Sequence, residues 1–322
     1  MQTIILNKPA KIGVNKKNVK ISEFDFVKKE THEKIYEPQQ IQQITLLNDK
    51  SSITNGAVKL LNGKSVSFIS KDSELATLSY INDSHEFAHL SKIMAGLPKS
   101  RVKKIGLVFC RGVCSQRIKV LIRLNEKRGN NSVVREHIKS MQLLQKQLAK
   151  NFKTSSKLKG IEGNIAKHFF AGIREFLPKG IGFQERNRDG EDLYNCLLNA
   201  SHSILRSKVH RKLLAHNVNP AFGFLHFQVD KRKPFLAWDF SEFWIPYMDK
   251  LCLYLIEKNI VTEKGQIIAQ NGHGKWLSKN SWKRLYEVTG LRVKDDEIEK
   301  KILEFKETLL YGKRFSWCRQ SE

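Results

Sequence analysis

The sequence contains no apolar run long enough to cross a membrane. A membrane-spanning helix needs roughly 18 to 20 consecutive apolar residues, and the segment from Met1 to Lys17 holds only the short run Ile4-Ile5-Leu6. From this pattern we expect a soluble, cytoplasmic protein. The chain also lacks an internal repeat and a low-complexity segment.

Cysteine is scarce as well. The chain has 5 cysteines, at Cys110, Cys114, Cys196, Cys252 and Cys318. An odd number of cysteines scattered among apolar neighbours does not suit a disulfide framework. The first two have the spacing of half a zinc site, but no second Cys or His pair of the usual spacing follows. We therefore predict buried thiols in a reducing compartment.

Acidic residues are few relative to basic ones. The chain has 57 Lys and Arg against 32 Asp and Glu, a formal net charge of +25. Such an excess attracts a polyanion, because Lys and Arg gain affinity for phosphates through counterion release. No basic amphipathic helix with an aromatic face stands out, which disfavours a membrane surface. We therefore expect nucleic acid as the partner and no membrane association.

The apolar pattern changes along the chain. Short β-branched or alternating runs predict strands at 3–6, 11–14, 19–21, 44–47 and 65–69, with a short helix at 54–61. Beyond residue 85 the pattern is mostly helical. Apolar residues recur there at spacings of three and four, as in Val134, Ile138, Met141, Leu144 and Leu148, and again in Ile298, Ile302, Phe305 and Leu309. We predict an α+β protein with a small N-terminal β-strand domain, residues 1–84, followed by a large all-α domain, residues 85–322.

Three short motifs carry carboxylate and imidazole side chains. Glu162 lies in G-I-E-G, His226 ends G-F-L-H, and Asp239 and Glu242 lie in W-D-F-S-E-F. Each has an ordinary structural explanation. A helix dipole favours Glu162 in a first turn, His226 follows apolar residues that suit a core, and the other two carboxylates would share one helical face.

Taken together, the motifs indicate a divalent-metal site. Oxygen ligands with one imidazole suit Mn²⁺ and Mg²⁺, and the thiolates that would favour zinc are absent from these motifs. A divalent cation neutralises a phosphodiester and helps to deprotonate an attacking hydroxyl, so no covalent nucleophile is needed. We interpret the motifs as a site that acts on a phosphodiester.

The order and spacing of the motifs resemble the CRISPR-associated adaptation integrase and endonuclease family, the universal spacer-acquisition integrase of CRISPR loci. The segments 186–188, 192–198 and 217–220 also follow the family's order. The resemblance implies Mg²⁺ or Mn²⁺ held by Glu162, His226 and Glu242, with Asp239 as an acidic residue close to the metal. The chain departs from the family at three positions, where the family often has proline, tyrosine and arginine: Leu193, His202 and Ile245.

The same resemblance implies an activity and partners. In the family, the 3′-hydroxyl of a short DNA fragment attacks a phosphodiester of the CRISPR array by transesterification, and attack by water gives a nuclease. The implied partners are double-stranded DNA, including branched or single-stranded forms, a second copy of the chain in a homodimer, and a small ferredoxin-like adaptation protein. The N-terminal domain would mediate dimerisation and partner contact, and the C-terminal domain would be catalytic.

Basic residues flank the metal motifs and predict contacts with the DNA backbone. The predicted DNA-binding residues are Arg186, Arg188, Asn195, Lys231 and Arg232. A further basic group suits either phosphate contact or a solvated helix face, and comprises Arg206, Lys208, Arg211 and Lys212. Three aromatic residues among lysines suit either base stacking or core packing: Trp276, Trp282 and Tyr286.

Three alternatives remain open. One is a mobile-element integrase of the same superfamily, and another is a basic DNA-binding protein without catalytic activity. The third is a zinc metalloprotease, because His85-Glu86-Phe87-Ala88-His89 matches H-E-x-x-H, in which two histidines bind zinc and the glutamate is the general base. The nearby residues supply no third ligand, and the segment equally suits the start of a helix.

Overall fold

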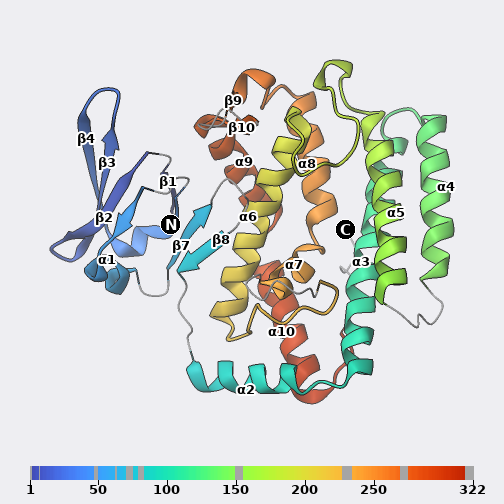
Figure 1. Ribbon diagram of the computed structural model, residues 1–322, viewed down its shortest axis with the longest axis horizontal. Helices are drawn as coiled ribbons and strands as arrows, with labels where there is room; N and C mark the ends of the chain where they lie inside the picture. Colours follow the sequence, from blue (N-terminus) through green and yellow to red (C-terminus); the bar gives the residue numbers. More distant parts are fainter. Residues whose placement is uncertain are drawn as a thin grey trace.

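The computed structural model describes residues 2–6, 8–46, 50–61, 64–69, 75–78, 83–148, 155–226, 234–268 and 275–315. Strands gather at one end of the molecule, and a larger group of helices forms the rest (Figure 1). The predicted α+β class is confirmed. The last strand of the N-terminal part ends at Leu78 and the next helix begins at Ser84, while the division of the chain into two domains at residue 84 stays a prediction.

The N-terminal part contains two four-stranded sheets. One has the order β1 (Gln2–Leu6), β5 (Ile41–Leu46), β7 (Ser65–Ile69) and β8 (Leu75–Leu78). The other has the order β4 (Glu30–Tyr36), β3 (Asn18–Asp25), β2 (Ala10–Asn15) and β6 (Ser52–Ile53). The short helices η1 (Pro38–Gln40) and α1 (Asn55–Leu60) lie between strands. Alternate strand residues point inward and form one apolar core, which includes Ile12, Val19, Ile21, Ile41, Ile44 and Leu46.

The five predicted strands and the short helix are confirmed, but three other strands of this part, β4, β6 and β8, were not predicted. The longest of these three is β4. It pairs with β3 in antiparallel register from Val19↔Tyr36 to Asp25↔Glu30. Every β4 residue before Tyr36 is exposed, so neither face carries the apolar alternation that marks a half-buried strand. In the part of the chain that the structure describes, the other edge of β4 has no strand partner.

The C-terminal part is built mainly from helices. They are α2 (Ser84–Ala95), α3 (Lys99–Glu126), α4 (Ser132–Gln147), α5 (Ser155–Arg174), η2 (Lys179–Ile181), α6 (Leu193–Ala215), α7 (Phe235–Ser241), α8 (Ile245–Glu257), η3 (Glu263–Gly265), α9 (Lys279–Arg292) and α10 (Asp295–Tyr311). A hairpin of β9 (Gln266–Ile268) and β10 (Lys275–Leu277) interrupts this otherwise helical part, and its strands are too short to show a pattern in the sequence. Within the described ranges, no helix is long and apolar enough to cross a membrane.

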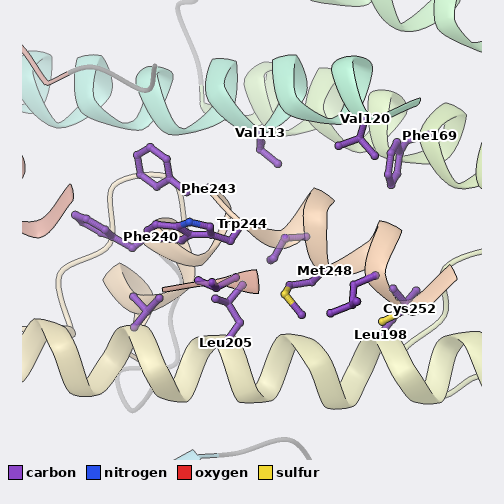
Figure 2. Packing of buried hydrophobic residues seen from close by; sticks show 14 of the residues in the cluster. Val113, Val120, Phe169, Leu198, Leu205, Phe240, Phe243, Trp244, Met248 and Cys252 are labelled. Atoms are coloured by element: carbon purple, nitrogen blue, oxygen red, sulfur yellow. The ribbon is translucent and has the colours of Figure 1, made fainter. Parts of the chain in front are cut away.

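Helix α6 lies at the centre of the large core. Most of its residues are buried, including the polar Asn195, Ser201 and His202, because other elements pack around it. Figure 2 shows α7 and α8 between α3 and α6, with Val113 and Val120 directed from α3 and Leu205 from α6. A helix covered on most sides loses the simple amphipathic stripe, and this is why the sequence indicates α6 less clearly than α4 or α10.

The predicted amphipathic helices α4 and α10 are confirmed. Each buries the predicted apolar positions, among them Val134, Ile138 and Met141 on α4 and Ile302 on α10. Helix α4 begins after Asn131, whose side chain accepts hydrogen bonds from the backbone N–H groups of the first turn. The cap satisfies donors that have no partner within the helix.

The predicted burial of the thiols is confirmed for four cysteines. Cys110, Cys114, Cys196 and Cys252 are free and buried, and Cys318 lies outside the described residues. Burial raises the pKa of the Cys252 thiol to about 12. These thiols therefore act as small apolar groups in the core.

One side-chain contact links the N-terminal sheet to the helices. The Gln43 amide oxygen on β5 accepts hydrogen bonds from Arg211 on α6, at 2.6 Å, and from the Tyr286 hydroxyl on α9, at 2.5 Å. Because Gln43 is buried, this polar contact fixes the position of the sheet against α6 and α9.

Helices α6 and α10 are joined by half-buried ion pairs at Asp295. Its two carboxylate oxygens lie 2.7 Å from Nζ of Lys208 and 2.9 Å from Nζ of Lys212. Burial alone would raise the pKa of Asp295, but the two lysines outweigh it and lower the pKa to about 2. The carboxylate is therefore more stable ionised in the folded protein than in the unfolded chain.

We expect Asp295→Asn to lower the free energy of unfolding by about 1 to 2 kcal/mol at neutral pH. A depressed folded-state pKa contributes stability above the unfolded pKa and loses it as the pH falls toward the folded pKa. The difference from the unchanged protein should therefore be complete above about pH 5 and shrink toward pH 2. Urea unfolding at neutral and acidic pH measures it, with the exposed neighbour variant Asp296→Asn as control. Equal stabilities of the two variants at neutral pH would contradict the assignment.

Candidate functional site

Two of the predicted metal ligands meet beside Arg117 of α3, and the third, His226, contacts Asp239 in the motif that also carries Glu242. Glu162 lies on α5, and Glu242 caps the C-terminal end of α7. The Arg117 guanidinium forms an ion pair with Glu162, and its Nη2 lies 4.0 Å from Oε2 of Glu242. The site thus joins side chains that are 45 and 125 residues from Arg117 in the sequence.

Buried charges dominate this cluster. Burial lowers the pKa of Arg117, but the Glu162 and Glu242 carboxylates outweigh it, so that the pKa lies above its ordinary value. Burial raises the pKa of Glu242 despite the nearby Arg117. Oε2 of Glu242 is buried and has no hydrogen-bond partner, which leaves an acceptor directed into the cluster.

Asp239 holds the loop that carries His226. Its carboxylate, fully buried on α7, accepts backbone N–H bonds from Phe224 at 2.6 Å, Leu225 at 3.0 Å and His226 at 2.9 Å. The Nδ1 atom of His226 lies 2.8 Å from the same carboxylate. These contacts occupy Asp239, so the structure gives it the role of positioning the loop and the imidazole.

The contact with Asp239 also determines which ring nitrogen of His226 is available to a ligand. With the ring proton on Nδ1, the Nε2 atom keeps its lone pair, which is the usual arrangement for a metal-binding histidine. Burial lowers the pKa of His226, but the hydrogen bond to Asp239 and the charges of Glu242 and Glu162 outweigh it and leave the pKa above its ordinary value. His226 is linked to the cluster through Asp239, which lies three residues before Glu242.

Two glycines permit the close packing of this loop. A Cβ atom at Gly106 of α3 would lie 2.4 Å from the Phe224 carbonyl oxygen, and one at Gly223 would lie 1.9 Å from the His226 carbonyl oxygen. Any larger residue would push the loop away. Gly223 belongs to the G-F-L-H motif, whereas no feature of the sequence singled out Gly106 or Arg117.

The donor set fits a hard divalent cation by its chemistry. Two carboxylates and an imidazole are ligands that Mg²⁺ and Mn²⁺ accept, and Oε2 of Glu242 is a buried acceptor that lacks a hydrogen-bond donor. Across the described ranges, no three His, Cys, Asp or Glu side chains lie close enough to hold an ion together. Instead, the Arg117 guanidinium lies beside both carboxylates and balances their charge.

Another arginine, half-buried, borders the site. The Arg206 guanidinium on α6 lies over the Trp238 ring, 4.8 Å from its centroid. Burial lowers the pKa of Arg206 to about 10, although the Glu242 carboxylate opposes this change. Arg206 is thus the member of its predicted basic group that lies near the metal motifs.

The other members of that group are engaged inside the protein. Lys208 and Lys212 pair with Asp295, and Arg211 donates to Gln43. Likewise, Trp282 is buried and the Tyr286 hydroxyl donates to Gln43, so these aromatic side chains pack internally. The Trp276 side chain lies outside the described residues.

The predicted DNA-binding residues have different surroundings. Arg186 donates to the side-chain oxygens of Asn195, at 3.1 Å, and Asn199, at 2.6 Å. Asn195 is buried and also bonds to Asp192 and to the segment before α6. Arg186 and Asn195 therefore hold this segment against α6, whereas the Arg188 side chain is exposed. Lys231 and Arg232 lie outside the described residues.

The H-E-x-x-H segment lies in the first turns of α2 and has a structural role. Glu86 accepts hydrogen bonds from Asn217, at 2.5 Å, and from Lys306 of α10, at 2.6 Å. Its pKa is lowered, first by Lys306 and then by Asn217. Since Glu86 links α2 to α10 and His85 and His89 are exposed, these contacts favour the helix interpretation over a protease site.

Solved structures share this fold. A casposase bound to integration product matches with a TM-score of 0.83 and 18% identity, over 98% of this chain and 93% of that chain. A Cas6-RT-Cas1–Cas2 complex matches with a TM-score of 0.80 and 17% identity, over 100% of this chain and 36% of that chain. The fold is therefore of the class that Cas1 and casposase proteins share.

The sequence itself matches the family described as CRISPR associated protein Cas1 over residues 3–289. The chain belongs to the Cas1 family, and the resemblance seen in the motifs is confirmed. A relative named CRISPR-associated endonuclease Cas1 2, from Saccharolobus solfataricus, is 34% identical over 117 residues, which cover 35% of this chain and 37% of the relative. The chain thus matches less than half the length of that relative.

The glycine contact at the His226 loop can be tested by Gly106→Ala. The added Cβ would meet backbone atoms, which cannot move as a flexible side chain can, so we expect a loss of about 1 to 3 kcal/mol in the free energy of unfolding. Gly163→Ala is the matched control, because nothing lies within 4 Å of its Cβ position and alanine favours a helix by up to about 1 kcal/mol. Thermal or urea unfolding compares them, and equal stabilities would contradict the close packing.

Proposed function

We propose that the protein is a metal-dependent DNA integrase and endonuclease of CRISPR adaptation, which joins the 3′-hydroxyl of short DNA fragments to the CRISPR array. The observation that carries this proposal is the arrangement of Glu162 and Glu242 around Arg117, together with His226, which is held by Asp239 three residues before Glu242. Membership of the Cas1 family and a relative named an endonuclease support it. The net charge of +25 suits a DNA substrate.

In this proposal, Mg²⁺ or Mn²⁺ is held by Glu162, His226 and Glu242. When bound, the ion supplies charge to the non-bridging phosphate oxygens and lowers the pKa of the attacking hydroxyl. His226 offers Nε2 to the ion because Asp239 holds Nδ1. Arg117 holds the two carboxylates, and a divalent ion would compete with Arg117 for them. The positive charge of Arg206 also acts on Glu242.

The reaction needs no covalent enzyme intermediate. In the joining reaction, the 3′-oxygen of the fragment forms a new bond to phosphorus as the scissile bond between phosphorus and the 3′-oxygen of the array breaks. The proton of the attacking hydroxyl is lost and the leaving oxygen gains one, so atoms and charge balance. If water attacks instead, the same site hydrolyses the strand.

The N-terminal sheets suit the proposed protein partners. The unpaired edge of β4 offers backbone groups, Ile35 on this strand is 53% exposed, and Phe26 and Val27 are 61% and 93% exposed beyond β3. Exposed apolar residues beside a strand edge are typical of an interface. They support a homodimer and contact with a small ferredoxin-like adaptation protein, and the likeness to a Cas6-RT-Cas1–Cas2 complex agrees with such a partner.

A second candidate function is integration by a mobile element. The observation that favours it is the TM-score of 0.83 to a casposase bound to integration product. The two candidates share the reaction and differ in the target. The two candidates are distinguished by comparing DNA joining to a plasmid that carries a CRISPR repeat with joining to one that lacks it. Adaptation predicts insertion at the ends of the repeat.

The metal assignment is tested by Glu162→Gln, His226→Ala and Glu242→Gln. We expect each to abolish Mn²⁺-supported cleavage and joining of labelled DNA, and to weaken the rise in melting temperature on Mn²⁺ addition. Asp239→Asn should reduce metal affinity by roughly 10- to 100-fold, since it acts through His226. Glu175→Gln, at an exposed position beyond α5, is the control.

Full activity of the Glu162→Gln protein at ordinary Mn²⁺ concentrations would refute this site. A requirement for Zn²⁺ in casein cleavage, lost in His85→Ala but kept in His226→Ala, would instead support the metalloprotease alternative. Specific, metal-independent DNA binding without cleavage or joining would support a non-catalytic protein.

The predicted DNA contacts divide into a structural and a binding residue. Arg186→Gln should lower the free energy of unfolding by about 1 to 3 kcal/mol, because its buried hydrogen-bond partners lose a charged donor. Arg188→Gln should change stability by less than about 0.5 kcal/mol, and should weaken DNA binding while reducing its salt dependence by about one unit. Denaturation and DNA titrations at several salt concentrations measure both. If Arg188→Gln lowered the stability and Arg186→Gln alone weakened DNA binding, the DNA would lie on another surface.

A further inference from the structure

Helices α3 and α8 lie side by side and run in the same direction away from the metal cluster. At one end, the Tyr247 hydroxyl of α8 donates to Gln116 of α3 at 2.8 Å. Near the other end, Arg128, just after α3, forms an ion pair with Glu257 of α8. Since both contacts join later residues of α8 to later residues of α3, the two helices are parallel.

Along α3 and α8, three basic side chains lie between these two contacts, and a fourth, at the end of α9, acts electrostatically on one of them. Arg123 and Lys127 come from the last part of α3, Lys250 from α8, and Arg292 from the end of α9. Burial lowers the pKa of Lys250, and the positive charges of Lys127, Arg123, Arg292 and Arg128 lower it further. We call these residues, Arg123, Lys127, Lys250 and Arg292, the α3–α8 cationic surface.

For three of the four residues of this surface, the charge is not balanced by an ion pair within the described ranges. Lys127 and Arg292 are exposed and Lys250 is half-buried, and none of the three forms an ion pair with a carboxylate in the described ranges. Of the two acids at this end of α3 and α8, Glu257 pairs with Arg128, while Glu126 is exposed. Like charges held together repel one another, so the surface favours an anionic partner.

The surface begins next to the metal cluster. Gln116 directly precedes Arg117, and Tyr247 follows Glu242 by one short turn and the start of α8. With a rise of about 1.5 Å per residue, Arg123 lies about 9 Å and Lys127 about 15 Å beyond Arg117 along the helix axis. Tyr254, 40% exposed, shares a face of α8 with Lys250. A chain of phosphates leading away from the cluster would meet these charges in succession.

We propose that the α3–α8 cationic surface binds backbone phosphates of the DNA strand that continues from the active site. Its identity as a DNA surface rests on the proposed function. The contacts are to phosphates, so binding through this surface is independent of base sequence. An acidic protein is the other occupant that the charge would permit.

The test compares two triple variants of the full chain. The first is Lys127→Gln with Lys250→Gln and Arg292→Gln. The control is Arg135→Gln with Lys146→Gln and Lys167→Gln, which removes the same charges from exposed positions on α4 and α5. Fluorescence anisotropy in EDTA measures binding to labelled duplex and single-stranded oligonucleotides of two unrelated sequences, at several salt concentrations.

For the first variant we expect affinity roughly 10-fold or more weaker at about 0.1 M salt, and a salt dependence lower by about two to three units, for both sequences alike. The control should stay within about two-fold of the unchanged protein. Equal effects of both variants, or unchanged DNA affinity of the first variant, would overturn the proposal. If the DNA affinity is unchanged and the first variant instead no longer binds an acidic protein that the unchanged protein binds, the surface is a protein-binding one.

Two further controls distinguish a loss of DNA binding from misfolding and from a defect at the metal site. If the triple variant unfolds, Lys127→Glu alone, at an exposed position, replaces it and should weaken binding by several-fold. Because the titrations are done in EDTA, they do not depend on the metal site. If the triple variant loses DNA affinity but the unchanged protein shows no metal-dependent joining, the DNA surface stands and the proposed function is refuted. If the unchanged protein joins DNA but the triple variant keeps full affinity, the proposed function stands and the DNA surface is refuted.

Discussion

The contact of Arg117 with two carboxylates is the interaction on which the rest of the helical part depends. It brings α3, α5 and the end of α7 together around charges that are largely shielded from water. Removing one partner from such a buried group typically costs about 3 to 5 kcal/mol, because the remaining charge is left without compensation. The packing of these helices and the composition of the candidate site therefore depend on the same interaction.

Asp239 imposes a second, more local constraint. A single carboxylate accepts three backbone N–H groups and contacts the imidazole of His226, so it determines both the path of the loop and the ring nitrogen that remains available. Gly106 allows α3 to approach this loop closely enough for Asp239 and Arg117 to belong to one site. The chemistry of His226 thus depends on a residue that acts through it.

The basic residues of the chain serve two purposes that charge alone does not distinguish. Lys208 and Lys212 neutralise Asp295 between α6 and α10, and Arg211 bonds to Gln43 at the junction with the N-terminal sheet. In contrast, Lys127, Lys250 and Arg292 belong to three separate helices and form no ion pair with a carboxylate in the described ranges. The sequence indicated the basic group on α6 because its members are close neighbours along one helix. The group of Lys127, Lys250 and Arg292 is recognised only from the packing of separate helices.

The sequence by itself determined the α+β class, five of the ten strands in the described ranges, the amphipathic helices α4 and α10 and the motifs of Glu162, His226 and Glu242. Apolar periodicity and local motifs are properties of neighbouring residues. The sequence could not indicate β4, whose two faces are exposed, or distinguish Arg186, held by Asn195 and Asn199, from the exposed Arg188. Only the tertiary structure decided that Arg117 balances the two glutamates and that Glu86 links α2 to α10. The physical reason is that burial and pairing of charges depend on which distant segments meet, and the spacing of residues along one segment carries no record of that.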